Sequence, residues 1–165
     1  MRIREIETSD AEGLATLTQQ VEGSSQFMLW EKGERMIGTD SQLKMIERMK
    51  NNENSTILVA EDETRLVGYL LVMGGNAKRN KHAAAIVVGI LEGYRGKGIG
   101  TQLFKELEQW ASKHRLRRLE LTVITRNEAG LSLYKKMGFE IEGVKKDSLR
   151  IDGEYVDEYY MAKIL

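Results

Sequence analysis

One continuous segment, residues 82–114, limits the possible folds of this chain more than any other. It starts with HAAAIVVGIL, residues 82–91, which carries no charged residue after the histidine. A strand that is apolar on both faces belongs in the middle of a sheet that is covered on both sides. Residues 98–114 follow with apolar side chains at three- and four-residue spacing, which predicts an amphipathic helix. The apolar positions of this helix are Ile99, Leu103, Leu107, Trp110 and Ala111.

Four other segments have the patterns of strands. The start, MRIREI, alternates between apolar and charged residues, and RRLELTVIT is similar. Residues 55–75 predict a hairpin with its turn at Asp62–Thr64. Residues 145–165 predict two strands that meet at Asp152-Gly153, a dipeptide typical of a type I′ turn.

Three further helices follow from periodicity and capping residues. Residues 8–23 have Ser9 or Asp10 at the N-cap position, and residues 41–52 place Leu43, Ile46 and Met49 on one face. Residues 127–138 have Asn127 as N-cap and Gly138 as C-cap. The order strand, two helices, three strands, helix, strand, helix, two strands predicts one mixed α/β domain over residues 1–165, with β-α-β crossovers in its second half.

Composition excludes several classes of function. Lys and Arg together number 25, as do Asp and Glu, so no overall basic field attracts nucleic acid or an anionic membrane. The apolar runs are too short to cross a bilayer, and the first residues lack a signal-peptide hydrophobic segment. Without Cys there is no disulfide, thiolate metal site or Cys nucleophile, and the two His have no metal-ligand partner at useful spacing. We therefore expect a cytoplasmic protein that holds no metal.

The stretch RGKGIGT, Arg95–Thr101, stands where the apolar strand gives way to the helix. The first N–H groups of a helix have no internal partner, and the helix dipole adds positive charge there. Glycines let a large anion approach such a backbone, and Arg95 and Lys97 add to the field, so the stretch predicts a phosphate site. The Walker pattern fails because Ile99 stands where Lys is required, and the dinucleotide fingerprint fails because residue 101 is Thr.

The pattern that fits is R-x-x-G-x-G, at Arg95, Gly98 and Gly100. It resembles the coenzyme A pyrophosphate loop of the GNAT N-acetyltransferase superfamily. A second motif, N-x(6)-Y-x(3)-GF, is similar to the family's fifth strand and fourth helix, and the element order agrees over essentially the whole chain. The second motif comprises Asn127, Tyr134, Gly138 and Phe139. The resemblance implies the GNAT fold: a mixed, mostly antiparallel sheet of six to seven strands, splayed between strands four and five and flanked by about four helices.

The resemblance also implies how acetyl-CoA is bound. The backbone of Gly89, Ile90 and Leu91 is expected to pair with the pantetheine arm in the gap between strands four and five. The amides of the glycine loop are expected to hold the pyrophosphate, and Asn127 to face the pantetheine. The loop residues are Arg95, Gly96, Lys97, Gly98, Ile99, Gly100 and Thr101.

Acyl transfer from a thioester to an amine passes through an oxyanion, for which the resemblance implies a backbone donor near Ile90. By the same resemblance, Tyr134 is the acid that protonates the leaving thiolate; the alternative is an aromatic residue that only packs on the sheet. Many family members carry an acid on strand four or five as base, but residues 83–91 contain none. Glu120 is the first candidate, Glu92 the second, and a base acting through water, or no dedicated base, stays open.

The loop FMLWEKGER, residues 27–35, lies where the family builds one wall of the acceptor site. Phe27 and Trp30 are candidates to cover the acceptor, Glu31 to attract a cationic amine, and Thr122 to share the face of Glu120. The alternative is that the aromatic residues fill the core and the charges are solvated.

We expect an acetyl-CoA-dependent N-acetyltransferase that acts directly on a primary amine of a small molecule or of a peptide or protein. Two alternatives are open: a non-catalytic acyl-CoA-binding or sensing module on the same fold, and a general nucleotide-phosphate binder. Homodimers are common in the family, and the sequence neither requires nor excludes one. The identity of the amine does not follow from the sequence.

Overall fold

The apolar strand lies at the centre of the sheet, as expected. In the computed structural model, which describes residues 1–165, it forms β4 (Ala83–Ile90) in a seven-stranded sheet of order β1-β2-β3-β4-β5-β7-β6. Only the β4–β5 pair is parallel, so the predicted mixed, mostly antiparallel sheet is confirmed. The other strands are β1 (Arg2–Glu5), β2 (Thr56–Asp62), β3 (Arg65–Gly74), β5 (Arg118–Ile124), β6 (Glu140–Ile151) and β7 (Glu154–Ile164).

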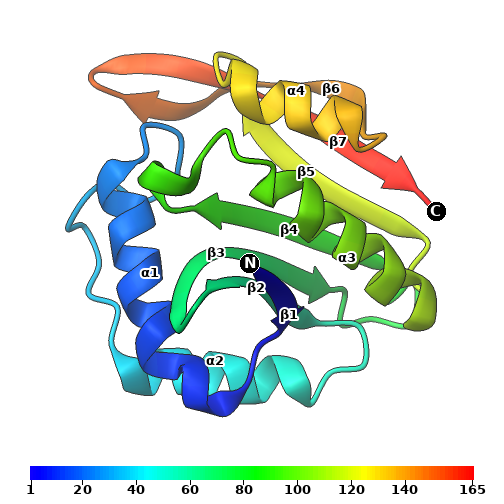
Figure 1. Cartoon of the computed structure of the whole chain (residues 1–165). Helices are drawn as coiled ribbons and strands as arrows, with labels where there is room; N and C mark the ends of the chain where they lie inside the picture. The colour runs from blue at the N-terminus through cyan, green and yellow to red at the C-terminus, as the bar shows by residue number, and fades with distance from the viewer.

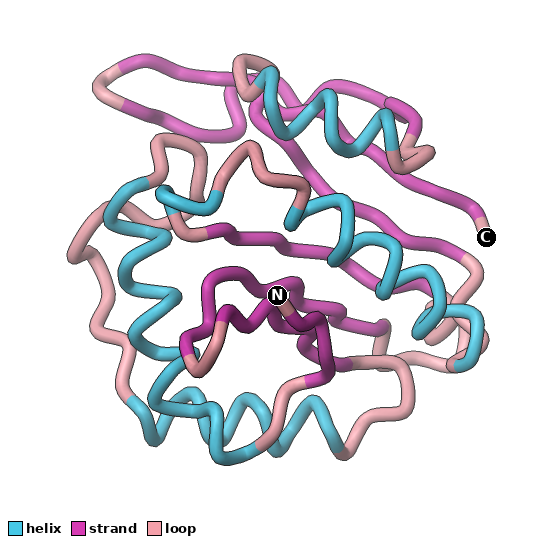
Figure 2. The backbone as a smooth tube through the Cα atoms, viewed as in Figure 1, coloured by secondary structure: helices cyan, strands magenta, loops and turns pink.

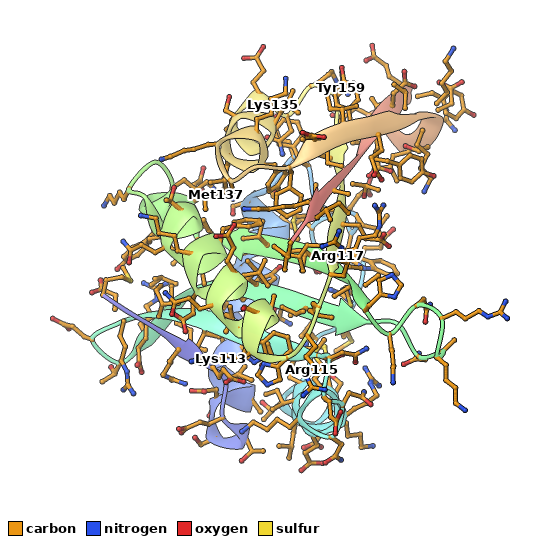
Figure 3. The ribbon with its side chains drawn as sticks, turned by 90° about the vertical axis from the view of Figure 1, so that its right-hand side faces the viewer. Lys113, Arg115, Arg117, Lys135, Met137 and Tyr159 are labelled. Atoms are coloured by element: carbon orange, nitrogen blue, oxygen red, sulfur yellow. The ribbon has the colours of Figure 1, made fainter.

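Four α-helices cover the two faces of this sheet (Figures 1 and 2). α3 and α4 lie on one side of it in the view of Figure 3, where Lys113 marks the end of α3 and Lys135 and Met137 lie at the end of α4. α1 and α2 pack against the other face, on strands β2 and β3. The helices are α1 (Ala11–Ser24), α2 (Thr39–Lys50), α3 (Ile99–Lys113) and α4 (Glu128–Lys136).

Two hydrophobic cores, one on each face, explain why β4 is apolar throughout. The larger core joins α3 to side chains such as Leu58, Leu70 and Ile86, and the smaller core joins α1 and α2 to Ile57 and Tyr69. Successive residues of a strand point to opposite faces, so strands between two cores need apolar residues at every position. Val88 packs on the larger core and Val87 on the smaller one.

The C-terminal hairpin has the predicted turn. Asp152 and Gly153 have φ of 50° and 79°, and two positive φ values are what a type I′ turn requires. β6 begins at Glu140, however, earlier than the predicted Lys145, because residues 140–144 pair with β7 despite their charges. An exposed edge strand tolerates such charges, which is why the sequence pattern there is weak.

Asp10 is the N-cap of α1, as predicted, but the first residues of both α1 and α2 differ from the prediction. A 3₁₀ turn, Thr8–Asp10, precedes α1, and Asp10 stands at the N-cap of α1 without a side-chain capping bond. The carboxylate of Asp10 instead accepts a hydrogen bond from the Glu7 amide and two from Arg4. α2 starts at Thr39, two residues before the predicted Ser41, with Gly38 as its N-cap. No helix of the chain is long and apolar enough to cross a membrane.

The ion pair between Arg4 and Asp10 ties β1 to the start of α1, and we expect Asp10→Asn to destabilise the protein. Arg4 Nη1 and Nη2 donate to the two Asp10 oxygens at 2.7 and 2.9 Å, which keeps the pKa of Asp10 below its usual value. A lowered folded-state pKa gives stability that is present above the unfolded pKa of about 3.9 and is lost as pH falls through the folded pKa. Urea unfolding at pH 7 should show a loss of about 1–2 kcal/mol.

The difference between Asp10→Asn and the native chain should shrink as pH falls below about 4, because the unfolded carboxyl is protonated first and the native carboxyl follows at its lower pKa. Glu154→Gln is the matched control, because the Glu154–Arg126 pair is largely exposed and exposed pairs add little. A loss of stability that stays constant down to pH 2 would contradict an electrostatic role for Asp10.

Candidate active site

The candidate site is built around a gap between β4 and β5. The two strands pair only at Ala83–Arg118, Ala84–Leu119 and Ala85–Glu120. Beyond these pairs the strands diverge toward their C-terminal ends (Figure 1), which confirms the predicted splay. Each strand stays fully paired on its other side, β4 with β3 and β5 with β7.

The open edge of β4 offers backbone groups to the gap. The Leu91 amide donates to the Val67 carbonyl on β3. Backbone groups of successive residues point to opposite sides of a strand, so the N–H and C=O of Ile90 point into the gap. Arg95 Nε donates to the Ile90 carbonyl at 3.2 Å, which agrees with a carbonyl that points away from β3. An extended ligand chain between the strands would find the Ile90 amide available for pairing, whereas the Ile90 carbonyl is shared with Arg95.

The glycine loop stands at the wide end of the gap, where the chain passes from β4 into α3. Gly96 and Gly98 have φ of 73° and 82°, and Gly98 is the N-cap of α3. None of the amides from Gly96 to Thr101 donates to a backbone carbonyl. Six successive free donors at a helix N-terminus are the arrangement that the glycine pattern predicts, and such an arrangement suits an anion.

The glycines predicted to bind the cofactor serve two different purposes. A Cβ on Gly96 or Gly98 would meet no atom within 4 Å, so these two are needed for their left-handed backbone and leave the cradle open. A Cβ on Gly89 would lie 2.5 Å from the Tyr69 ring, and one on Gly100 would lie 2.8 Å from Leu133. Gly89 and Gly100 therefore allow close packing: Gly89 against β3, and Gly100 between α3 and α4.

Three cationic side chains, Arg95, Lys97 and Lys136, lie near the glycine loop, and Arg95 is bound by other groups of the protein. Arg95 is tied to the fold, because its Nη2 donates to Ser24 Oγ at 3.2 Å in addition to its bond with Ile90. Lys97 Nζ lies 5.4 Å from the centre of the Tyr94 ring. Lys136 Nζ lies 3.4 Å from Thr101 Oγ1. Sequence analysis did not select Lys136, whose approach to the loop depends on how α4 docks on α3.

The second motif fixes α4 at both ends. Asn127 Oδ1 accepts from the Gly130 amide at 3.0 Å and caps the helix. At the other end the Gly138 amide donates to Lys135 and the Phe139 amide to Tyr134, with φ of 91° at Gly138. This is a Schellman cap, which ends a helix at a defined residue. Three of the four motif residues thus set the position of the fourth, Tyr134.

The Tyr134 ring packs between α4 and α3. Its centroid is 5.7 Å from that of Phe104 and 6.3 Å from that of Phe139. Burial raises the pKa of the Tyr134 hydroxyl to about 12, because the phenolate is poorly solvated there. The hydroxyl is therefore protonated at neutral pH and is suited to donate a proton or a hydrogen bond.

A pocket of about 470 Å³ opens at the closed end of the gap. Glu120 and Thr122 of β5 line it, and they share the sheet face that α1 and α2 cover on β2 and β3. Arg118 Nε donates to Glu120 at 2.7 Å, and Arg118 also binds both oxygens of Glu142 on β6. Glu142 is a site residue that the sequence analysis missed, since β6 was expected to start after it.

Glu92, the second candidate base, is not near Glu120. It is exposed in a 3₁₀ turn, Glu92–Tyr94, that follows β4. Five residues of extended strand, about 17 Å, separate Ala85 beside Glu120 from Ile90 just before this turn. Glu120 and Glu92 therefore lie at opposite ends of the gap.

The loop between α1 and α2 does not fill the core with its aromatic residues. Phe27 and Trp30 are each 39% exposed and Glu31 is exposed, whereas Met28 packs on the smaller core. Arg35 holds the loop to α1 through an ion pair with Glu22, and its guanidinium lies 5.0 Å from the centre of the Trp30 ring. Glu22 is buried on α1. The sequence analysis passed over it because VEGS reads as an ordinary helix end.

The chain matches the sequence profile of the Acetyltransferase (GNAT) family over residues 26–139. The match contains β4, the glycine loop, the gap and the α4 motif. The chain belongs to the GNAT family. The resemblance expected from the glycine loop and the second motif is thereby confirmed.

Other GNAT proteins resemble this chain in sequence and fold. It is 34% identical over 119 residues to the L-amino acid N-acetyltransferase AaaT of Escherichia coli K12, covering 72% of this chain and 74% of that protein. An acetyltransferase of the GNAT family from Streptococcus pneumoniae superposes with a TM-score of 0.95 at 28% identity, over 99% of this chain and 98% of the other. A putative acetyltransferase of Salmonella typhimurium, solved with acetyl-CoA, shares the fold at 19% identity and a TM-score of 0.87, over 99% and 93%.

We expect Gly98→Ala to weaken binding of acetyl-CoA to this GNAT protein. The left-handed backbone of Gly98 costs a side-chain-bearing residue about 1–2 kcal/mol, and the added methyl group would stand in the open cradle. The Kd measured by calorimetry should rise about tenfold or more. Gly93→Ala is the control, since Gly93 is also open but has no positive φ. Equal affinities in the two variants would contradict the assignment of the cradle.

Proposed function

We propose that this GNAT protein is an N-acetyltransferase that moves the acetyl group of acetyl-CoA to a primary amine within a ternary complex. The observation that carries the proposal is the row of free amides from Gly96 to Thr101 at the mouth of the β4–β5 gap. Amides at a helix N-terminus bind phosphate well. The gap beside them provides an extended slot for the arm that joins the phosphates to the thioester.

The coenzyme would be held mainly by backbone groups. The loop amides take the pyrophosphate, with Lys97 and Lys136 close by to balance its charge. The pantetheine arm then pairs with β4 along Gly89–Leu91, in the place of a missing strand. Asn127 Oδ1 is used in the helix cap, which leaves the Nδ2 amide group as its donor toward the pantetheine.

The chemical step needs one bond to form and one to break. The neutral amine nitrogen attacks the thioester carbonyl carbon, and the carbonyl oxygen becomes an oxyanion that the Ile90 amide is placed to stabilise. Collapse of this intermediate breaks the carbon–sulfur bond and releases the CoA thiolate. Tyr134 donates its proton to that sulfur, and the proton lost by the amine goes to a base or to water.

Glu120 is the better of the two candidate bases because it lies in the pocket at the closed end of the gap. Its Oε2 is bound by Arg118, which leaves Oε1 as the oxygen for an amine proton or for a water in between. Glu92 would have to act from the wide end of the gap, next to the glycine loop. Thr122, next on the same face as Glu120, is placed to contact the acceptor.

Amine-dependent release of CoA thiol from acetyl-CoA tests the proposal, and Tyr134→Phe tests the acid. The native protein should release thiol faster with an amine panel than without it. Tyr134→Phe keeps the ring between Phe104 and Phe139 and loses only the proton donor, so kcat should fall about 10²-fold while the calorimetric Kd for acetyl-CoA stays the same. Tight binding of acetyl-CoA without amine-dependent release would favour a binding module, and an unchanged kcat would remove Tyr134 as the acid.

Glu120→Gln tests the base, with Glu92→Gln as its counterpart at the other end of the gap. If Glu120 accepts the amine proton, its replacement should lower kcat/KM and alter the shape of the pH–rate profile, and Glu92→Gln should leave both unchanged. Steady-state thiol release at a series of pH values measures both. If neither variant alters the profile, the proton leaves through water without a carboxylate base.

A further inference from the structure

Tyr69 of β3 lies across β4 and points toward the gap. It is the register partner of Gly89, and a Cβ on Gly89 would lie 2.5 Å from Cζ of the Tyr69 ring and 2.6 Å from its hydroxyl oxygen. Neighbouring strands are about 4.8 Å apart, so a ring whose far end stands over Gly89 extends from β3 across to β4. The hydroxyl is therefore directed toward the edge of β4 that opens into the gap.

The Tyr69 hydroxyl is close to the backbone amide that we propose as the oxyanion donor, Ile90. Three covalent bonds join the Cβ position of Gly89 to the Ile90 nitrogen. With bond lengths of about 1.3–1.5 Å, the hydroxyl oxygen lies at most about 7 Å from that nitrogen. Tyr69 is therefore near enough to contact an amine that attacks a thioester held at Ile90.

The Tyr69 hydroxyl has no hydrogen-bond partner in the protein. Tyr69 is only 3% exposed. Burial raises the pKa of its hydroxyl, the charge of Glu22 raises this pKa further and the charge of Arg35 lowers it, without a contribution from any hydrogen bond. The oxygen is not one of the four side-chain atoms that are enclosed without a partner, so a ligand can reach it. Buried tyrosine hydroxyls usually have a partner, and an acceptor molecule can supply one here.

Glu22 brings a carboxylate to the same end of β4. Arg35 Nε and Nη2 both donate to Glu22 Oε1, which leaves Oε2 without a partner although the residue is only 4% exposed. Oε2 is not an enclosed atom either. Two residues further along α1, Ser24 accepts a hydrogen bond from Arg95, which also donates to the Ile90 carbonyl. This bridge holds the end of α1 beside the end of β4 (Figure 1).

Tyr69 and Tyr134 approach the gap from opposite faces of the sheet. Tyr134 packs on the larger core and Tyr69 belongs to the smaller one. On the Tyr134 side, α3 and α4 are joined through Phe104. On the Tyr69 side, the loop between α1 and α2 borders the smaller core, and its Phe27 and Trp30 are each 39% exposed. The Tyr69 side is therefore the one from which an acceptor can enter.

We infer that Tyr69 and Glu22 bind the amino group of the acceptor beside the thioester. Glu22 Oε2 attracts the nitrogen while it is still an ammonium ion. Once the amine is neutral, the Tyr69 hydroxyl oxygen accepts a hydrogen bond from it, and the lone pair of the nitrogen stays free to attack the carbonyl carbon. The inference rests on the acetyltransferase activity proposed above and adds the residues that hold the second substrate. The proton acceptor proposed there stays the same.

Tyr69→Phe removes the hydroxyl and keeps the ring across Gly89. Because the hydroxyl has no partner in the protein, the melting temperature should not fall, and the calorimetric Kd for acetyl-CoA should stay the same. By thiol release, kcat/KM should fall about tenfold, the effect of one hydrogen bond, for butylamine, lysine and glycine ethyl ester alike, because the contact is to the nitrogen that they share. Thiol release without amine should not change.

Tyr155→Phe is the matched control, because Tyr155 is 65% exposed on β7, and its kcat/KM should equal that of the native protein. If Tyr69→Phe also keeps the native kcat/KM for every amine that the native protein acetylates, the inference is overturned and the acetyltransferase activity stands.

Glu22→Gln tests the carboxylate, and Arg35→Met separates its charge from its support of the loop. Glu22→Gln should raise KM for the same amines about tenfold with little change in kcat, because the charge acts on ammonium binding and not on the chemical step. Arg35→Met breaks the same ion pair but keeps the carboxylate, so it should not raise KM. An equal rise of KM in both variants would assign the effect to the loop and overturn the role of Glu22. If acetyl-CoA binds but no amine on a broad panel releases thiol from the native protein, the proposed function itself fails.

Discussion

The structure of the site depends on the end of pairing between β4 and β5 after three residue pairs. Each strand keeps its full ladder on the outer side, with β3 and with β7, so the sheet does not fall apart where the inner ladder stops. Unpaired strand edges inside a fold are costly unless something satisfies them. An extended ligand arm is such a partner, and the free amides of the glycine loop lie at the end from which it would enter.

Aromatic and small residues together keep the two halves of the gap in place. Phe104 of α3 contacts both Tyr134 and Phe139 edge to face, which joins the helix after β4 to the helix after β5. Gly100 lets α3 approach Leu133 of α4 closely, and Gly89 lets β4 lie against the Tyr69 ring. The open gap is thus bounded by tight contacts on both sides, and this rigidity positions Tyr134 without any bond to its hydroxyl.

The parts of this arrangement that sequence reasoning predicts are local. The residue pattern of 82–114 by itself predicts a strand, a loop and a helix. Asn127 and Gly138 mark the ends of α4 because they are typical capping residues. Glu22 and Glu142 were not predicted because their contacts depend on partners distant in the sequence. Glu22 meets Arg35 across a loop, and Glu142 meets Arg118 of β5 at a bulge in the β6–β7 register. A bulge changes which residues share a face, and no local pattern reveals it.

Within each of the two motifs, residues of the same motif have different structural roles. Of the glycines, Gly96 and Gly98 have left-handed backbones, whereas Gly89 and Gly100 allow close packing. Of the α4 motif, Asn127 and Gly138 cap the helix, and Tyr134 and Phe139 pack against Phe104. Under the proposed function, coenzyme binding depends mostly on backbone groups, which tolerate many side chains around them. The pocket, by contrast, is lined by side chains such as Arg118 and Glu142, which come from separate strands, and such a lining can change while the fold and the glycine loop stay the same.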